Sequence, residues 1–213
     1  MNMNKLLLLF AFLIVFLNAC TKDKDTSIPV TPRVVDSSLY VIHYWNFNNA
    51  DTLPNVALVS GSNISFDYNT SVGVGYTDYT TSTATANLRN ADTAGNCLRV
   101  RNPVNSMTIA VPTTGYKNII LNFEADRTSK GAQTDSIYYS VDQGKTFTNT
   151  GLSNNAFLPQ VDPLYTLYTF NFSAISAVNN NPKFLIKIVF TNGNLNASGN
   201  DRFDNITLEG KLY

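Results

Sequence analysis

The sequence predicts an all-β fold for residues 39–213, a jelly-roll β-sandwich of about ten strands. Runs rich in Val, Ile, Tyr, Phe and Thr recur along this stretch, between clusters of Asn, Gly, Asp and Pro. One segment, Ser173–Val178, suggests a helical turn, with Ser173 as its cap and Pro182 soon after it. Many strands, polar turns and few helical signals are typical of a sandwich.

We expect strands near residues 39–48, 63–68, 72–79, 97–101, 106–111, 117–125, 135–142, 145–149, 164–172, 183–191 and 202–210. The segment 183–191 shows the period of two best, because Phe184, Ile186, Ile188 and Phe190 fall on one side of it. It therefore predicts a strand with one core face and one mixed face.

Two other stretches carry predictions of their own. Trp45 alternates with Val41 and Phe47, which assigns it to the core and not to a binding surface. Residues 80–96 are rich in Thr, Ala and Asn and predict a long loop, and long loops on sandwiches often carry binding.

The first twenty residues predict where the protein works. Lys5 precedes an unbroken apolar run from Leu6 to Leu17, and Ala19 and Cys20 follow it. A charged start, an apolar middle and a small residue before the cut are typical of a secretory signal. The run is shorter than the roughly 20 residues that a membrane-spanning helix needs. An ordinary signal peptide or a membrane anchor is the alternative interpretation.

The run Leu17-Asn-Ala-Cys20 resembles a bacterial lipobox, whose Cys is acylated and becomes the new first residue. The resemblance implies that residues 1–19 are a lipoprotein signal peptide and that Cys20 is lipidated. It also implies an outer membrane lipoprotein, surface-exposed or periplasm-facing, with acyl chains on Cys20 as its contact with the membrane. Residues 20–38 are the lipidated Cys and a polar, flexible tether. The charged run Lys22–Asp25 loosely resembles the export signals of Bacteroidetes-type lipoproteins.

Charge and composition exclude several classes of function. Without residues 1–19 the chain carries 14 basic residues, which is 15 minus Lys5, and 15 acidic ones, so no basic surface recruits nucleic acid. His43 is the only histidine, which excludes a two-histidine metal site. No phosphate-binding glycine loop and no nucleophile elbow occur. Cys97 has no partner once Cys20 carries lipid, and its apolar context predicts a buried, inert thiol.

The sharpest internal motif is Ser140-Val-Asp142-Gln-Gly144-Lys-Thr-Phe147, which is similar to the Asp-box hairpin of sialidase propellers. Asp142 can accept hydrogen bonds from turn amides, Gly144 permits a positive φ, and Phe147 can pack back beneath the hairpin. Propellers repeat this motif in each blade, whereas here it occurs once. It therefore predicts a structural hairpin and not an enzyme site.

A wider resemblance runs along the domain through short motifs: Tyr44-Trp-Asn-Phe-Asn-Asn49, Asn118–Arg127, Ser140–Phe147, Tyr168–Ile175 and Asp201-Arg-Phe-Asp-Asn-Ile-Thr-Leu-Glu209. Their order resembles the galactose-binding-like jelly-roll domains of Bacteroidetes-type surface lipoproteins. The likeness covers roughly residues 39–213 and implies the fold more strongly than the function.

Asp204 is the first candidate site residue. If strand alternation is unbroken, Asp204 shares a face with Ile206 and Leu208 and enters the rim of the core, where a carboxylate needs a partner. One partner is a structural calcium ion of the kind that related jelly rolls hold, with Asn48, Asp51 and Asp204 as its ligands. Arg202 or turn amides are the alternative.

Aromatic residues are the second lead, because sugar rings stack on aromatic rings while Asn, Arg and Asp bind their hydroxyls. The candidate glycan-binding residues are Tyr76, Tyr79, Arg127, Tyr138 and Tyr165. Core packing is the alternative for each tyrosine, since Tyr is a favoured strand residue.

These observations predict a non-catalytic, lipid-anchored cell-surface protein whose domain binds carbohydrate. A structural or adhesive module that binds protein is the alternative. Glycoside hydrolysis is the third and lowest-ranked hypothesis, because it needs two carboxylates that face one cleft. Its clustered candidates are Glu124, Asp126 and Asp135.

Overall fold

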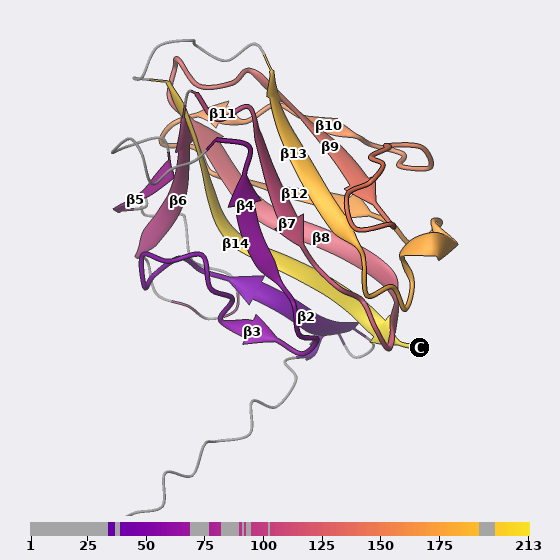
Figure 1. Ribbon diagram of the computed structural model, residues 1–213. Coiled ribbons are helices and arrows are strands. Elements are labelled where there is room, and N and C mark those ends of the chain that lie inside the picture. The colour runs from indigo at the N-terminus through magenta and orange to yellow at the C-terminus, as the bar shows by residue number, and fades with distance from the viewer. Residues whose placement is uncertain are drawn as a thin grey trace, which may run out of the picture. The chain divides into compact units, whose positions relative to one another are not determined.

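A computed structural model of the chain describes residues 34–36, 39–68, 77–81, 90, 92, 95–101, 103–191 and 199–213, and for 34–36 and 77–81 it describes the backbone alone. These residues belong to one unit, Pro32–Tyr213. Two β-sheets face each other in a jelly-roll β-sandwich, which confirms the predicted fold class (Figure 1). Cys20, Tyr76 and most of the predicted loop 80–96 lie outside the described residues.

The larger sheet, here called sheet A, is built around the long C-terminal strand. Its strands are β1 (Val34–Asp36), β2 (Leu39–Trp45), β3 (Val56–Ala57), β5 (Thr77–Thr81), β6 (Asn96–Arg101), β8 (Tyr116–Arg127), β11 (Gln160–Val161), β12 (Thr166–Asn171) and β14 (Asn200–Leu212). β14 pairs with β8 along one side. On its other side β14 pairs first with β6 and then with β2. β12 continues the sheet beyond β8, and β11 pairs with β8 in parallel.

The smaller sheet, here called sheet B, is antiparallel throughout. Its strands are β4 (Asn63–Phe66), β7 (Ser106–Ala110), β9 (Thr134–Ser140), β10 (Ala156–Phe157) and β13 (Leu185–Thr191), in the order β10-β9-β13-β7-β4. β13 lies in its middle, where Phe184, Ile186 and Ile188 are fully buried, so the core face predicted for 183–191 is confirmed.

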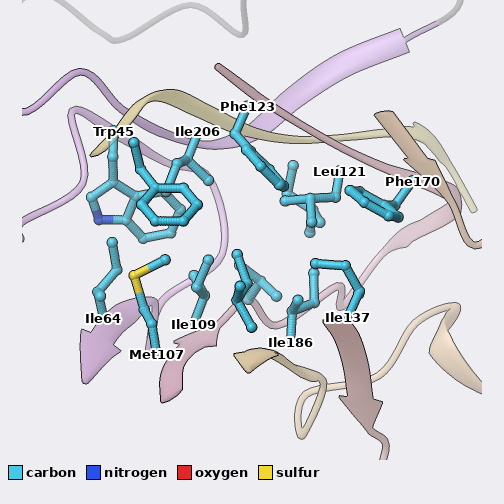
Figure 2. Close-up of a cluster of buried hydrophobic side chains, with 14 of the residues drawn as sticks. Trp45, Ile64, Met107, Ile109, Leu121, Phe123, Ile137, Phe170, Ile186 and Ile206 are labelled. Carbon is cyan, nitrogen blue, oxygen red and sulfur yellow. The ribbon is translucent and has the colours of Figure 1, made fainter. Parts of the chain in front are cut away.

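The core fills the space between the two sheets. Figure 2 shows Trp45, Ile206, Phe123, Leu121 and Phe170 of sheet A above Ile64, Met107, Ile109, Ile186 and Ile137 of sheet B. Phe123 is central to an aromatic cluster and contacts the rings of Phe157, Tyr168, Phe170 and Phe203. Trp45 is fully buried, as predicted. Each such side chain removes apolar surface from water, which is the main stabilising term of the fold.

Two local predictions are wrong. Residues 145–149 form no strand, because the turn after Ser140 extends into them. They keep one isolated β-bridge, between Thr148 and Tyr139. The helical turn is a short 3-10 helix, η3 (Ser176–Val178), and its N-cap position is Ile175 and not Ser173. Among the described residues, no helix has the length and apolar character that crossing a bilayer requires.

Candidate functional site

A β-bulge in β14 decides which side chains leave the core. Between Asp204 and Thr207 of β14 there is one more residue than between their partners Glu124 and Asn122 on β8. The extra residue is Asn205, whose φ is +49°. Asn tolerates this left-handed conformation better than most residues.

The bulge corrects the prediction that Asp204 shares a face with Ile206. Phe203 and Ile206 both point into the core, on either side of the extra residue. Asp204 therefore points to the outer side of sheet A, opposite Glu124. Unbroken alternation gave the wrong face because a bulge shifts every later side chain by one position.

The outer side of sheet A at this level is polar, and we call it the polar face. Its members are Glu124 and Asp126 of β8, Arg202, Asp204 and Asn205 of β14, Tyr44 of β2, Cys97 of β6, and Tyr165, which precedes β12. Most of these side chains are buried, although burying polar groups is unfavourable unless they are paired. The hydrogen bonds and ion pairs of these side chains therefore define the candidate site.

Arg202 joins two carboxylates at one end of the polar face. Its Nη1 lies 3.3 Å from Asp126 Oδ2, and its Nη2 lies 2.9 Å from Asp162 Oδ2. Burial raises the pKa of Asp126 to about 6, against the opposing effect of Arg202. The second oxygen of Asp126, Oδ1, is buried and has no hydrogen-bond partner in the described structure.

Tyr165 crosses the polar face toward β6. Its hydroxyl donates to Cys97 Sγ over 3.1 Å. Burial raises the pKa of the Tyr165 hydroxyl and raises that of the Cys97 thiol to about 11. Cys97 is fully buried, so the prediction of a buried thiol is confirmed.

Asn205 organises the other end of the polar face. Its side-chain amide donates to Glu124 Oε2 over 2.9 Å, and its Oδ1 accepts from the Tyr44 hydroxyl over 2.6 Å. The Tyr44 hydroxyl also contacts Asp92 Oδ2. These contacts make one continuous polar network across β8, β14 and β2.

Asp204 lies inside this network. Its Oδ1 accepts from the Asn205 amide over 2.8 Å, whereas its Oδ2 is buried with no partner among the residues described. Burial raises the pKa of Asp204 to about 8, and the negative charges of Glu124 and Asp92 add to the shift. The polar face thus holds a second unused acceptor oxygen, besides Asp126 Oδ1.

The polar face meets solvent along β12. The outward side chains of this strand, Leu167, Thr169 and Asn171, are exposed, and Thr169 Oγ1 donates to Asn122 Oδ1 over 2.7 Å. Leu167 is opposite Glu124 in the register. An exposed apolar side chain beside unused acceptors and tyrosine hydroxyls suits a ligand with apolar faces and many hydroxyl donors.

The structure separates the residues predicted to bind glycan. Tyr165 belongs to the polar face, whereas Tyr138 is opposite Lys187 on the outer side of sheet B. Arg127 ends β8 and donates to the carbonyl of Pro159 over 3.0 Å. Tyr79 lies on β5, whose backbone alone is described, and Tyr76 lies outside the described residues. Alternation gives the face of one strand but not the sheet to which the strand belongs.

Two of the residues predicted as metal ligands, Asn48 and Asp51, accept hydrogen bonds from backbone amides. Asn48 Oδ1 accepts from the Asn96 amide, and Asp51 Oδ1 accepts from the Leu53 amide, each over 3.0 Å. In the described ranges no three His, Cys, Asp or Glu residues gather as a metal site.

The carboxylates predicted as hydrolase candidates are divided between two faces. Glu124 and Asp126 share the outer side of β8, and Asp126 is paired with Arg202. Asp135 is buried on β9, on the inner face with Ile137 and Tyr139.

The Ser140–Phe147 hairpin has the structure that the motif predicts. Asp142 Oδ1 accepts from the Thr146 amide over 3.0 Å, and Gly144 has a φ of +83°. Hydrogen bonds from Ser140 and Thr146 lower the pKa of Asp142 to about 2. The ammonium of Lys187 lies 3.7 Å from the centre of the Phe147 ring. The hairpin therefore has a structural role as a turn, and it lies away from the polar face.

The pairing of Asn205 with Glu124 and Tyr44 was missed by reasoning from the sequence. One signal for it was present: the pair Asp204-Asn205 interrupts the spacing between Phe203 and Ile206, and Asn is the residue that best tolerates the left-handed position of a bulge. The contact of Tyr165 with Cys97 and that of Tyr44 with Asp92 join segments that are distant in the sequence, so no local pattern indicated them.

Comparisons with known proteins bear on the fold. No family model matches the chain, and no curated protein matches it either. Among solved structures, it is similar to the CBM22-1 xylan-binding domain of Paenibacillus barcinonensis Xyn10C, with a TM-score of 0.50 and 10% identity over 81% of this chain and 96% of that domain.

Two further solved structures have lower scores. TmCBM61, solved with β-1,4-galactotriose, has a TM-score of 0.43 and 10% identity over 76% of this chain and 92% of that one. An adhesin domain of Lys-gingipain from Porphyromonas gingivalis has a TM-score of 0.43 and 7% identity over 78% and 95%. The structural neighbours thus include carbohydrate-binding modules, and the likeness to the xylan-binding domain establishes a shared β-sandwich fold.

Proposed function

We propose that this domain is a non-catalytic carbohydrate-binding module and that its polar face, with the outward side of β12, is the binding surface. One observation carries the proposal: Asp126, which is paired with Arg202 through Oδ2, has a second oxygen, Oδ1, that is buried without a hydrogen-bond partner among the described residues. A sugar hydroxyl supplies the donor that this oxygen lacks. Unpaired buried acceptors are costly, so a ligand that satisfies one gains binding energy.

The composition of the surface supports a sugar over other ligands. Carboxylates accept hydrogen bonds from sugar hydroxyls, guanidinium groups donate hydrogen bonds to them, and side-chain amides do both. Leu167, which is 51% exposed, offers apolar contact to the face of a sugar ring. The xylan-binding domain of similar fold makes xylan a rational first probe for this chain.

Binding without catalysis fits the state of the carboxylates. Asp126 is tied to Arg202, and Glu124 accepts from Asn205. Each carboxylate thus has a protein partner on one oxygen, which suits a role in holding the binding surface.

We further propose that Cys20 carries the lipid that holds this domain to the outer membrane. The support is the charged start, the apolar run and the lipobox-like Leu17–Cys20 of the sequence. Several acyl chains are needed for a stable hold, because one chain binds only marginally. Mass spectrometry of native material tests this, and an unmodified Cys20 thiol would contradict it.

A protein-binding surface module is the second candidate, and one observation favours it. Leu158, Val161, Leu164 and Leu167 are exposed along the segment that leads into β12. Among the described strands, β12 pairs with β8 alone, so its other edge is open. Exposed apolar side chains beside an open edge are features of protein-binding surfaces.

The test is calorimetric titration of the full chain with soluble xylan, followed by a glycan array. Asp126→Ala removes the unused acceptor and should weaken binding at least tenfold, whereas Asp67→Ala, an exposed carboxylate after β4, should not. Tyr165→Phe should weaken binding, while its matched control Tyr138→Phe on sheet B should not. Products released from the glycan, or equal binding by all four variants, would contradict the proposal.

A further inference from the structure

Strand β12 lies at one edge of sheet A, and on the side away from β8 it pairs with no described strand. We call this side the open edge. On its other side β12 pairs with β8 residue for residue and without a bulge, from Thr166 opposite Ala125 to Asn171 opposite Ile120. Alternate residues of an antiparallel strand direct their backbone N–H and C=O groups to opposite sides. Half of the backbone groups of β12 therefore face the open edge.

The hydrogen bonds to β8 show which residues these are. The Phe172 amide donates to the carbonyl of Ile119 over 2.9 Å, so Phe172 and every second residue before it bond to β8. The N–H and C=O groups of Leu167, Thr169 and Asn171 therefore point to the open edge. All three residues are exposed, so water reaches this part of the strand.

The open edge lacks the features that usually prevent pairing with another chain. Exposed edges are protected by Lys, Pro or a bulge, or they are very short. The six residues Thr166–Asn171 include no charged residue and no Pro, and their ladder with β8 is regular. The neighbouring edge of sheet B is different, because β10 has only two residues. Its Phe157 ring lies 4.7 Å from the Tyr168 ring, so both edges are on the same side of the sandwich.

Exposed leucines lie beside the open edge. Leu167 of β12 is 51% exposed, and Leu164, which precedes the strand, is 62% exposed. Leu158 is exposed as well, and its carbonyl accepts from the Tyr168 hydroxyl over 2.7 Å, which holds it next to the middle of β12. Free backbone groups with apolar side chains beside them are what a sheet edge offers to an added strand.

The same edge of a second copy of the chain is a complementary partner. A two-fold axis through Tyr168 lays β12 antiparallel to itself and places Leu167 of one protomer opposite Thr169 of its partner, so that the groups at the open edge form hydrogen-bonded pairs. Residues 164–172 carry no charge, so no like charges meet across the pair. The whole chain has a formal net charge of 0, so two copies do not repel each other at a distance either.

We propose that the chain forms a two-fold dimer in which the open edges of two β12 strands pair and join both A sheets into one continuous sheet. A contact of one short strand and a few leucines is small, so the dimer is weak and depends on the protein concentration. Pairing at the edge leaves the outer side of sheet A free in each protomer. The dimer therefore does not rest on glycan binding, and it places two polar faces on the same sheet.

Sedimentation velocity of the full chain at increasing protein concentration tests the dimer. A non-ionic detergent covers the apolar run Leu6–Leu17 and keeps it from associating. Wild type should change from monomer to dimer as the concentration rises. Leu167→Lys brings two like charges into the interface and should raise the Kd of the dimer by about tenfold or more. The matched control Leu53→Lys changes an exposed leucine between β2 and β3, away from β12 in the sheet order, and should leave the Kd unchanged.

A second variant tests the backbone pairing itself. Thr169→Pro removes an N–H group that faces the open edge and not β8, so it should abolish the dimer while the circular dichroism spectrum keeps its β signal.

The outcomes separate the alternatives. A wild-type chain that stays monomeric at every concentration would overturn the proposal and leave the open edge to a different protein or to none. A dimer that survives both Leu167→Lys and Thr169→Pro would place the interface elsewhere. Should a variant fail to fold, hydrogen exchange of wild type decides: the Leu167 and Thr169 amides should become protected as the concentration rises, and protection confined to β4 would contradict the assignment. Titration with xylan measures glycan binding separately from all of these results.

Discussion

The side-chain amide of Asn205 donates a hydrogen bond to Glu124 Oε2 over 2.9 Å, from a residue whose backbone has a positive φ. The same side chain accepts from Tyr44. Asn205 is thus both the extra residue of the bulge and the link between three strands. Because the bulge turns Asp204 outward, the polar face depends on this one position.

Replacing Asn205 should separate its two roles. Asn205→Ala leaves buried Glu124 and Tyr44 short of a partner and should lower the free energy of unfolding by about 3 kcal/mol. Asn205→Gly loses the same hydrogen bonds but accepts the positive φ, so it should cost about 1 kcal/mol less. Urea denaturation measures both. Equal losses would show that the backbone conformation is not strained.

Stability should fall as the pH rises from 6.5 to 8. Asp204 has a pKa of about 8 in the folded chain against 3.8 as its ordinary value, so the folded state holds its proton more tightly. The stability from this group is full below pH 3.8 and is lost as the pH rises through 8. Each proton contributes a slope of up to about 1.4 kcal/mol per pH unit.

The pH range from 6.5 to 8 excludes the opposing effect of His43, whose contribution to stability grows as the pH rises. Burial lowers the pKa of His43 to about 4, so its contribution is full above pH 6.5 and is lost as the pH falls toward 4. Thermal unfolding in EGTA measures this stability. Between pH 6.5 and 8, the unfolding midpoint should decline less steeply for Asp204→Asn than for wild type. Identical slopes would place the titrating acid elsewhere.

Gly144 of the Asp-box turn has a matched counterpart in Gly115, which precedes β8. Gly144 and Gly115 have φ values of +83° and +82°, so alanine at either should cost about 1–2 kcal/mol. A Cβ on Gly144 would also lie 3.2 Å from Leu185 Cδ1, whereas one on Gly115 meets nothing within 4 Å. Gly144→Ala should therefore be the more destabilising in urea denaturation, and the reverse order would refute this packing account.

Cys97 should not react with thiol reagents until the chain unfolds. The thiol is fully buried and its pKa is raised to about 11, so the reactive thiolate is scarce at neutral pH. Labelling with DTNB in a Cys20→Ser chain isolates this residue. Prompt labelling under native conditions would mean that the Tyr165 side of the polar face opens readily.

Much of the fold was predictable, because it follows from strand periodicity. The alternation around Ile186 gives the core face of β13, and the same pattern places Trp45 in the core. The two-residue strands β3, β10 and β11 were not predicted, since two residues show no period. The failure at 145–149 has another cause: the turn at Gly144 ends the pairing.

The site was less predictable, because it depends on register and on distant contacts. Unbroken alternation put Asp204 on the core side, and one bulge residue reversed that. Tyr138 and Tyr165 show the same local pattern, but Tyr138 lies on sheet B, whereas Tyr165 lies on the outer side of sheet A. Asp135 resembled Glu124 and Asp126 in sequence, and only the packing of β9 reveals that it faces inward.

The central claim is that sugar binds the outer side of sheet A, and chemical-shift mapping tests it most directly. The full chain is titrated with the oligosaccharide that binds best in the glycan array, and backbone amide shifts are followed. We predict shifts that centre on Tyr165, Thr169 and Arg202. Shifts centred on Tyr138 and Lys187 of sheet B, or no saturable shift with any glycan, would contradict the account.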